Sequence, residues 1–384
     1  MKRPLQTMTS AIFIAGAALA SNSIDALAQE LPKATQKILQ QIKLDPSYLK
    51  GIDAELAVPA EWIARAKKEG TFTIAASDPE KAFRAYIAPF VERYPFIRPQ
   101  YEHGSYNNRV IKPLLAFKQG RLITDITTSI TGAIHMFDEV KALASLKDIP
   151  NFNNVREELR PDSGLFASKD LRLWCMAYNT GKVKKDSLPK KWEDLITMKE
   201  LHNNVVGAND RSMTWLVPLR NEWGIAKTTD FIQAFMGTVR PQLRQEGINA
   251  LTGLTSLGEV PISIPSGDTQ VYELATKGGK VAWHCPDVIP ASVAEIALLN
   301  GSPHTFASKI FINWLLSREG QIAQYSEIFT PPVHKDLPIE KFAVYPDELK
   351  GKKQVAINAN FSDEHAEEVQ KVWGGLWQKR MQTK

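Results

Sequence analysis

Apolar positions recur along the chain with two periods, one typical of helices and one of short strands. Residues 61–69 have a helical pattern that ends at Gly70, and the β-rich run 71–76 (TFTIAA) follows at once. A second helical pattern begins after Ser77-Asp78-Pro79-Glu80, with Ser77 or Asp78 as the expected cap. Pro89 lies inside that pattern and predicts a kink.

The alternation of strands and helices continues to the end of the chain. The predicted strands are 97–101, 123–127, 171–178, 205–208, 257–264 and 280–285, and the predicted helices include 107–119, one beginning at Trp192, and 307–317. Such alternation predicts βαβ units and an open, largely parallel sheet, an α/β fold. Ligands of such sheets bind beyond the carboxyl ends of the strands, which directs attention to the turns that follow them.

The N-terminus has the layout of a secretory signal peptide. Lys2-Arg3 is basic, residues 11–20 are apolar, and Ala26-Leu27-Ala28 is a small-x-small cleavage site. We expect cleavage after Ala28; a buried N-terminal helix is the alternative. Residues 29–58 are polar and helix-prone and are interpreted as an N-terminal extension.

Length and composition narrow the class of protein. The chain of 384 residues is too long for one ordinary core, which favours two lobes, and no apolar stretch after the signal peptide is long enough to span a membrane. The net charge of +5 is scattered among acids, so nucleic acid is not implied. Cys175 and Cys285 permit one bridge in an oxidising compartment, and neither belongs to a CxxC pattern.

Several short segments occur together in a characteristic order. They are Trp62 with Ala66-Lys67-Lys68-Glu69-Gly70, Phe90 to Tyr94-Pro95, Asp125-Ile126 to Ser129, Tyr178-Asn179-Thr180, Pro189 with Trp192, Asp194 and Leu195, Gly258-Glu259, and Ala307 to Gln321. In this order they resemble the iron(III)-type branch of the type II periplasmic solute-binding proteins, a family-1 extracellular solute-binding branch. The resemblance covers about residues 59–375.

The resemblance implies two α/β lobes, a two-strand hinge and a cleft between the lobes that holds the ligand. Its implied divisions are a signal peptide at 1–28, an extension at 29–58, lobe 1 at 59–174, lobe 2 at 175–284, and a return to lobe 1 over 285–384 with C-terminal helices near the hinge. The hinge strands would cross near 172–178 and 281–287. Because both cysteines would lie in these neighbouring strands, a disulfide is one possibility and two free thiols the other.

The same resemblance implies a function. The chain would be a monomeric periplasmic component of an ABC importer, which captures a small solute, hands it to an inner-membrane permease, and needs neither a cofactor nor a catalytic group. A sensor that presents its closed form to a receptor is an alternative. A secreted α/β enzyme is another, although the sequence contains no GxSxG, HExxH or Walker motif.

Iron binding in this branch uses a His, a Glu and a Tyr-Tyr pair. Those positions correspond here to Pro79, Ile130 and Asp268-Thr269, with Tyr272 nearby but single. Ferric iron prefers hard oxygen ligands of the phenolate and carboxylate kind, so the changes disfavour a metal site and favour an anionic organic solute. A ferric-binding protein remains the alternative.

The candidate ligand-binding residues are polar groups at loop-to-helix junctions of both lobes. They are Ser77, Asp78, Thr128, Ser129, Arg211, Ser212, Asp268, Thr269 and Tyr272. Arg211 is the sharpest candidate because its planar guanidinium could hold a carboxylate bidentately; the alternative is a surface arginine paired with Asp210 or Glu222. Hydroxyls at such junctions could instead only cap helices, and Trp215 and Tyr272 could stack on a ligand or merely pack.

Overall fold

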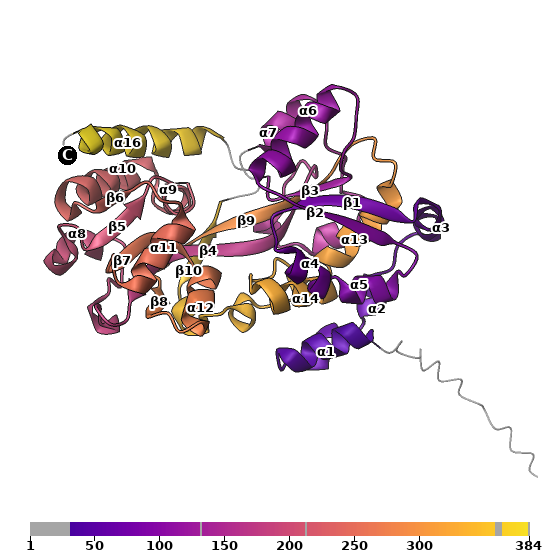
Figure 1. Ribbon diagram of the computed structural model, residues 1–384, viewed down its shortest axis with the longest axis horizontal. Helices are drawn as coiled ribbons and strands as arrows, with labels where there is room; N and C mark the ends of the chain where they lie inside the picture. The colour runs from indigo at the N-terminus through magenta and orange to yellow at the C-terminus, as the bar shows by residue number, and fades with distance from the viewer. Residues whose placement is uncertain (1–30, 131–132, 212, 358–362, 383–384) are drawn as a thin grey trace, which may run out of the picture. The chain divides into compact units, whose positions relative to one another are not determined.

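The computed structural model describes residues 31–130, 133–211, 213–357 and 363–382 (Figure 1). Within them, ten strands form one sheet in the order β2-β1-β3-β9-β4-β7-β5-β6, with β10 beside β9 and β8 beside β4. The strands are β1 Thr71–Ala76, β2 Arg98–His103, β3 Ile126–Thr128, β4 Ala167–Asn179, β5 Val206–Asn209, β6 Gln242–Arg244, β7 Ile262–Gly267, β8 Val281–His284, β9 Val288–Leu298 and β10 Lys353–Ala356.

The first half of the sheet is built from strands near the N-terminus. Strand β1 pairs in parallel with β2 on one side and β3 on the other, and β3 meets β9 in antiparallel pairing. The main helices of this half are α3 Ala60–Glu69, α4 Glu80–Tyr86, α5 Ala88–Arg93, α6 Lys112–Lys118, α7 Ile134–Glu139, α13 Thr305–Leu316 and α14 Arg318–Ile328. The parallel pairing directs the carboxyl ends of β1 and β3 toward the same edge, as expected from the sequence.

The second half of the sheet repeats this arrangement with later strands. Strand β5 pairs in parallel with β6 and β7, and β7 meets β4 in antiparallel pairing. The main helices here are α8 Asp194–Thr197, α9 Leu216–Trp223, α10 Ile225–Ala234, α11 Ile248–Leu257 and α12 Asp268–Thr276. Helix α12 begins directly after β7, so its N-terminus lies at the end of a parallel strand.

Two long strands join the halves. The first part of β4 pairs with β9, whereas its last residues pair with β7 and β8. The expected crossing near 172–178 therefore lies within β4. The second crossing is β9, which begins at Val288, later than the expected 281–287; that region contains the short strand β8 and the turn after it. Pro290 interrupts the β9 sequence, and proline is uncommon inside a central strand.

Local predictions were accurate where the pattern was strong. Strand β1 covers 71–76, and α3 ends at Gly70, whose φ of +67° favours glycine. The expected kink at Pro89 is a break between α4 and α5. The expected cap is wrong: Pro79 occupies the N-cap position of α4, and neither Ser77 nor Asp78 caps it with a side chain.

The predicted N-terminal extension is part of the core where the structure describes it. Helices α1 Lys33–Gln41 and α2 Ile52–Glu55 bury apolar side chains, among them Ile38 and Leu39. Glu55 forms a salt bridge to Arg318 at 2.6 Å at the start of α14. The extension is thus held to the first half of the sheet by both apolar packing and charge. The predicted signal peptide at 1–28 lies outside the described residues.

The C-terminal helix packs on the second half of the molecule. Helix α16 Asp363–Gln382 lies along α9 and α10 in Figure 1. Trp373 stacks on Phe235 and meets Trp215 edge-on, and its Nε1 donates to the carbonyl of Asp210 at 3.2 Å. The sequence led us to expect the C-terminal helices near the hinge; α16 is held in the second half of the molecule by its contacts with α9 and α10.

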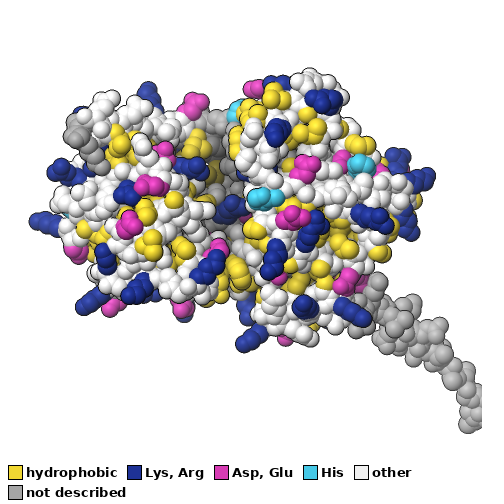
Figure 2. Space-filling model, viewed as in Figure 1, with side chains coloured by type: hydrophobic (Ala, Val, Ile, Leu, Met, Phe, Trp, Pro, Cys, Tyr) yellow, Lys and Arg dark blue, Asp and Glu magenta, His cyan; other side chains and the backbone are white. Residues whose placement is uncertain are grey.

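The two cysteines form a disulfide between Cys175 in β4 and Cys285 after β8. Of the alternatives left open by the sequence, the structure has the bridged one. Both cysteines are fully buried. No helix among the described residues is long and apolar enough to cross a membrane. Charged side chains of both signs are interspersed on the face drawn in Figure 2, as the scattered charges of the sequence predicted.

Candidate functional site

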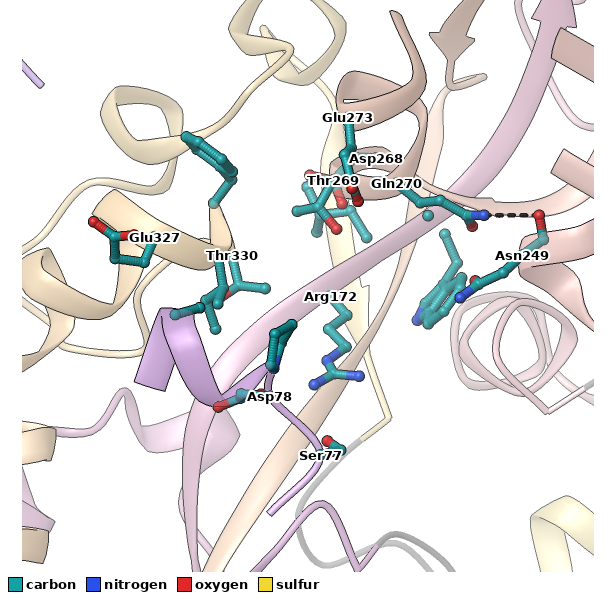
Figure 3. A pocket seen from close by; sticks show the side chains of 17 residues that line it. Ser77, Asp78, Arg172, Asn249, Asp268, Thr269, Gln270, Glu273, Glu327 and Thr330 are labelled. Atoms are coloured by element: carbon teal, nitrogen blue, oxygen red, sulfur yellow. Dashed lines mark hydrogen bonds between the residues drawn. The ribbon is translucent and has the colours of Figure 1, made fainter. Parts of the chain in front are cut away.

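A cavity of about 490 Å³ opens beside β4, between strand ends of the two halves of the sheet (Figure 3). Its polar or charged lining residues are Ser77, Asp78, Arg172, Asn249, Asp268, Thr269, Gln270, Glu273, Glu327 and Thr330. They come from the end of β1, from β4, from the starts of α11 and α12, and from the end of α14. The cavity therefore lies beyond the carboxyl ends of β1 and β7, where an open α/β sheet places its ligands.

Arg172 points into the middle of this cavity (Figure 3). Side chains alternate along a strand, so Leu171 and Leu173 are buried on one face of β4 while Arg172 and Trp174 lie on the other. The Arg172 side chain is 35% exposed. A guanidinium in this position offers a fork of N–H donors to an anion in the cavity.

Arg172 is oriented by a buried carboxylate of the same strand. Its Nε lies 3.2 Å from Oδ1 of Asp170, whose other oxygen is 2.6 Å from Nζ of Lys169. Burial raises the pKa of Asp170, but the charges of Lys169 and Arg172 outweigh it and lower that pKa. Asp170 thus stays ionised and holds the guanidinium in place.

Asp78 belongs to the same ion cluster. Its Oδ2 is 3.3 Å from Nζ of Lys169 and accepts a hydrogen bond from the Tyr86 hydroxyl at 3.1 Å. The Tyr101 hydroxyl donates to the Asp78 carbonyl. Asp78 lines the cavity as predicted, but one of its oxygens is already occupied by protein partners. Its clearest role is to neutralise the buried lysine.

The opposite wall is the N-terminus of α12. Asp268, its first residue, is 2% exposed, and its Oδ2 has no hydrogen-bond partner among the described residues. Burial raises the pKa of Asp268 to about 7, although backbone N–H groups and Arg172 act in the opposite direction. Thr330 Oγ1, on the far side of the cavity, is likewise buried without a partner in the described chain. Buried polar atoms of this kind are usually paired, so both are candidates for ligand contacts.

Four of the nine predicted residues line the cavity: Ser77, Asp78, Asp268 and Thr269. Thr128 and Ser129 are at the end of β3, beside β1, but do not line it. The Ser129 hydroxyl is 3.4 Å from that of Ser77. Arg109 donates to the backbone carbonyls of Thr128 and Ser129, which fixes that strand end from behind.

The remaining predictions fall elsewhere. Arg211 follows β5 as expected, but it is exposed and does not line the cavity; Ser212 lies outside the described residues. Tyr272 lines a separate cavity and packs against Phe329, with ring centroids 5.3 Å apart. Trp215 is fully buried among aromatic rings, so it packs rather than stacks on a ligand.

Sequence reasoning missed Arg172. The signal was present in part: Arg172 is a charged residue inside the predicted strand 171–178, and the charged Lys169 and Asp170 directly precede that strand. Charged side chains are seldom buried unless they are paired or functional. Asn249 also lines the cavity, next to Gln270, whose Nε2 donates to the Asn249 carbonyl at 2.8 Å (Figure 3). In the described part of the chain, no three His, Cys, Asp or Glu side chains are grouped to hold a metal ion.

Solved structures share this fold. An ABC transporter substrate-binding protein from Bradyrhizobium japonicum is similar at a TM-score of 0.65 and 17% identity, over 80% of this chain and 99% of that one. Iron-bound HitA from Pseudomonas aeruginosa is similar at 0.62 and 18%, over 79% and 99%. AfuA from Actinobacillus pleuropneumoniae, with fructose-6-phosphate bound, is similar at 0.58 and 15%, over 79% and 97%.

These likenesses confirm the predicted two-lobed α/β fold of the periplasmic binding proteins. No curated protein matches the chain. A model of the family described as bacterial extracellular solute-binding protein matches residues 125–365, well over half of the sequence, and this region includes Arg172, Asn249 and the start of α12. The chain therefore belongs to the bacterial extracellular solute-binding protein family, as its sequence motifs indicated.

Proposed function

We propose that the chain is the periplasmic substrate-binding component of an ABC importer, which captures a small organic anion in the cavity around Arg172. It would be exported by the signal peptide at 1–28, act as a monomer, deliver its ligand to an inner-membrane permease, and catalyse no reaction. Membership of the extracellular solute-binding family supports the transport role. The lining of the cavity supports an anionic ligand.

The observation that carries the ligand class is the Arg172 side chain, which extends into the cavity with its guanidinium toward Ser77 (Figure 3). Asp170 holds this guanidinium, and its remaining N–H groups can donate to an anionic head group. The positive end of the α12 dipole lies on another wall of the same cavity and acts in the same direction. Asn249 and Thr269 add neutral polar groups on the same side.

The cavity is lined from both halves of the sheet. Ser77 and Asp78 follow β1, whereas Asn249, Asp268 and Thr269 begin helices of the second half. We take these halves as the two lobes, with boundaries near those expected from the sequence and with β4 and β9 as the hinge strands. A ligand that contacts both halves would stabilise a closed form over an open one, which is how differential affinity shifts such an equilibrium.

The proposal is tested with a ligand panel followed by one matched pair of variants. The panel of carboxylates, phosphonates, sugar phosphates, amino acids and ferric salts is screened by thermal shift, and positives are measured by calorimetry. A true ligand raises the stability by about 2.7 kcal/mol at a hundredfold excess over its Kd. The binding should be lost in Arg172→Ala and kept in Arg211→Ala, since Arg211 is exposed outside the cavity.

Three outcomes would contradict the proposal. Tight ferric binding that survives Arg172→Ala would favour the iron-binding alternative. Turnover of the bound compound during calorimetry would favour a secreted enzyme. Equal binding by the two arginine variants would move the site away from Arg172.

A further inference from the structure

Trp174 is a second residue of β4 whose side chain lines the cavity. It lies two positions after Arg172, so the two side chains leave the same face of the strand about 6.6 Å apart. The indole is half-buried and packs against the apolar core, which makes it a fixed part of the cavity wall. The anion site at Arg172 makes no use of this ring.

The indole of Trp174 lies across β4, from one neighbouring strand to the other. Its Nε1 donates to Oγ of Ser292 on β9 at 2.8 Å. The residue paired with Trp174 on β7 is Gly267, and a Cβ atom added there would lie 3.4 Å from Cζ3 and 3.8 Å from Cε3 of the indole. Because β9 and β7 flank β4 on opposite sides, the ring spans the width of β4 and is fixed at both ends.

Gly267 keeps the space beside the indole free of a side chain. Its φ of −76° is one that any residue can adopt, so the backbone does not require glycine at this position. A methyl group there would meet the Trp174 ring at an ordinary van der Waals distance, but it would take up part of the cavity, which Gly267 also lines. The absence of a side chain thus leaves room for a ligand against the indole.

The cavity is larger than an anionic head group needs. Its volume of about 490 Å³ lies in the range of pockets that hold a whole organic molecule. A carboxylate or phosphonate group bound by Arg172 would fill only a small part of it. The rest is lined by apolar side chains such as Trp174 and Phe329, and by Glu273 and Glu327, which disfavour a second negative charge on the ligand.

We infer that the ligand is an organic anion that carries an aromatic ring, with its head group at Arg172 and its ring stacked on Trp174. This inference rests on the proposed function and names its ligand class more closely. Stacking buries apolar area and gains from the favourable geometry of aromatic pairs. The hydrogen bond to Ser292 already holds the indole, so little ordering of the side chain is required on binding.

Two matched pairs of probes test the inference: 2-phenylethylphosphonate with ethylphosphonate, and 3-phenylpropanoate with propanoate. The members of a pair share a head group and differ only by the ring, which a two-carbon linker lets reach along β4 from Arg172 to Trp174. Calorimetry on the purified protein gives the four affinities. In at least one pair we expect the ring-bearing member to bind about tenfold more tightly or better.

Two substitutions of Trp174 separate stacking from simple apolar contact. Trp174→Phe keeps a flat ring and should retain at least a fivefold preference for the ring-bearing probe. Trp174→Leu keeps an apolar side chain without a flat face, so the two members of the pair should bind within threefold of each other. Both variants lose the hydrogen bond to Ser292, so that loss does not account for a difference between them.

Gly267→Ala tests the same surface without changing the indole. Its methyl group should lower the affinity for the ring-bearing probe at least threefold and leave that for the ring-free probe unchanged. Trp223→Leu is the matched control, at a half-buried tryptophan of α9 that does not line the cavity, and it should keep the preference of the wild type. Thermal melting verifies that each variant is folded.

Equal affinities within both pairs in the wild type, or the same ring preference in Trp174→Leu as in Trp174→Phe, would overturn the inference and leave the anion site at Arg172 intact. If none of the four probes binds, or if their binding survives Arg172→Ala, the proposed function fails first and the inference with it.

Discussion

Asp170 and Arg172 form an ion pair on one face of β4, with Oδ1 3.2 Å from Nε. Asp170 is fully buried, whereas Arg172 reaches the cavity. The buried Asp170 carboxylate fixes the direction of the guanidinium. The N–H groups of Arg172 that do not contact Asp170 face the space where a ligand would lie.

Arg172→Ala should weaken binding of an anionic ligand by about 2–5 kcal/mol, by analogy with charge pairs that lose one partner. Arg172→Lys should recover only part of the affinity, because an ammonium group cannot form the bidentate contact. Calorimetry with the ligand identified by screening measures both. Arg211→Ala serves as the control and should remain within threefold of the wild type; a larger loss there would place the anion near β5 instead.

Lys169 is the residue whose loss should damage the fold most within this cluster. Its side chain is 1% exposed and contacts Asp170 at 2.6 Å and Asp78 at 3.3 Å. Lys169→Ala would leave two buried carboxylates with less compensation, so we expect a loss of about 3–5 kcal/mol in unfolding free energy. Urea denaturation measures it. Lys141→Ala, at a highly exposed lysine that pairs with Asp138, is the comparison and should change stability by less than about 1 kcal/mol.

The empty protein should lose stability as pH rises from about 4 to 7 through Asp268. Its pKa is raised from 3.8 to about 7, so in that range the folded chain holds a proton that the unfolded chain releases. The unfolding free energy of Asp268→Asn, measured relative to that of the wild type, should therefore increase by about 2–4 kcal/mol between pH 4 and pH 8. Denaturant unfolding at several pH values measures this difference. A difference that does not vary with pH would show that the pKa of the Asp268 carboxyl is not raised.

The disulfide should contribute measurably to stability. Cys175 and Cys285 are 110 residues apart in sequence and 5.1 Å apart between their Cα atoms. Closing a loop of that length lowers the entropy of the unfolded chain, which in the chain-entropy model is worth about 4–5 kcal/mol. Reductant should lower the denaturation midpoint of the wild type and leave a variant with Ala at both positions unchanged. Two thiols that react with an alkylating agent in unfolded, unreduced protein would contradict the bridge.

The hydrophobic periodicity of the chain was sufficient to predict local helices and strands. It was not sufficient to predict contacts between segments that are distant in sequence. Helix α3 and strand β1 were predicted nearly to the residue because each has a strong pattern and Gly70 marks the boundary between them. Strand β9 was missed because Pro290 and a run of small residues hide its period, and its pairing with β4 depends on contacts far away in sequence. The packing partners of α16 could not be predicted for the same reason, because its own pattern does not identify α9 and α10.

The cavity lies at strand ends that the sequence indicated, but the arginine that lines it is Arg172 and not Arg211. Ser77, Asp78, Asp268 and Thr269 were identifiable because each follows a strand. Arg172 lies within a strand, so a search restricted to turns could not find it. Only the packing of the two halves shows that its face of β4 is open to a cavity.

Arg172 lies on β4, in the stretch that pairs with β9, and this placement has a consequence for kinetics. When two lobes rotate about a hinge axis, atoms close to the axis hardly move. The position of the Arg172 charge would therefore be nearly the same in the open and the closed form. Ligand capture would then occur in two stages: an ionic encounter at Arg172 whose rate depends on salt, and a later rotation that brings Ser77 and Thr269 together and sets the residence time. Increasing ionic strength would slow association and leave the dissociation of the captured ligand almost unchanged.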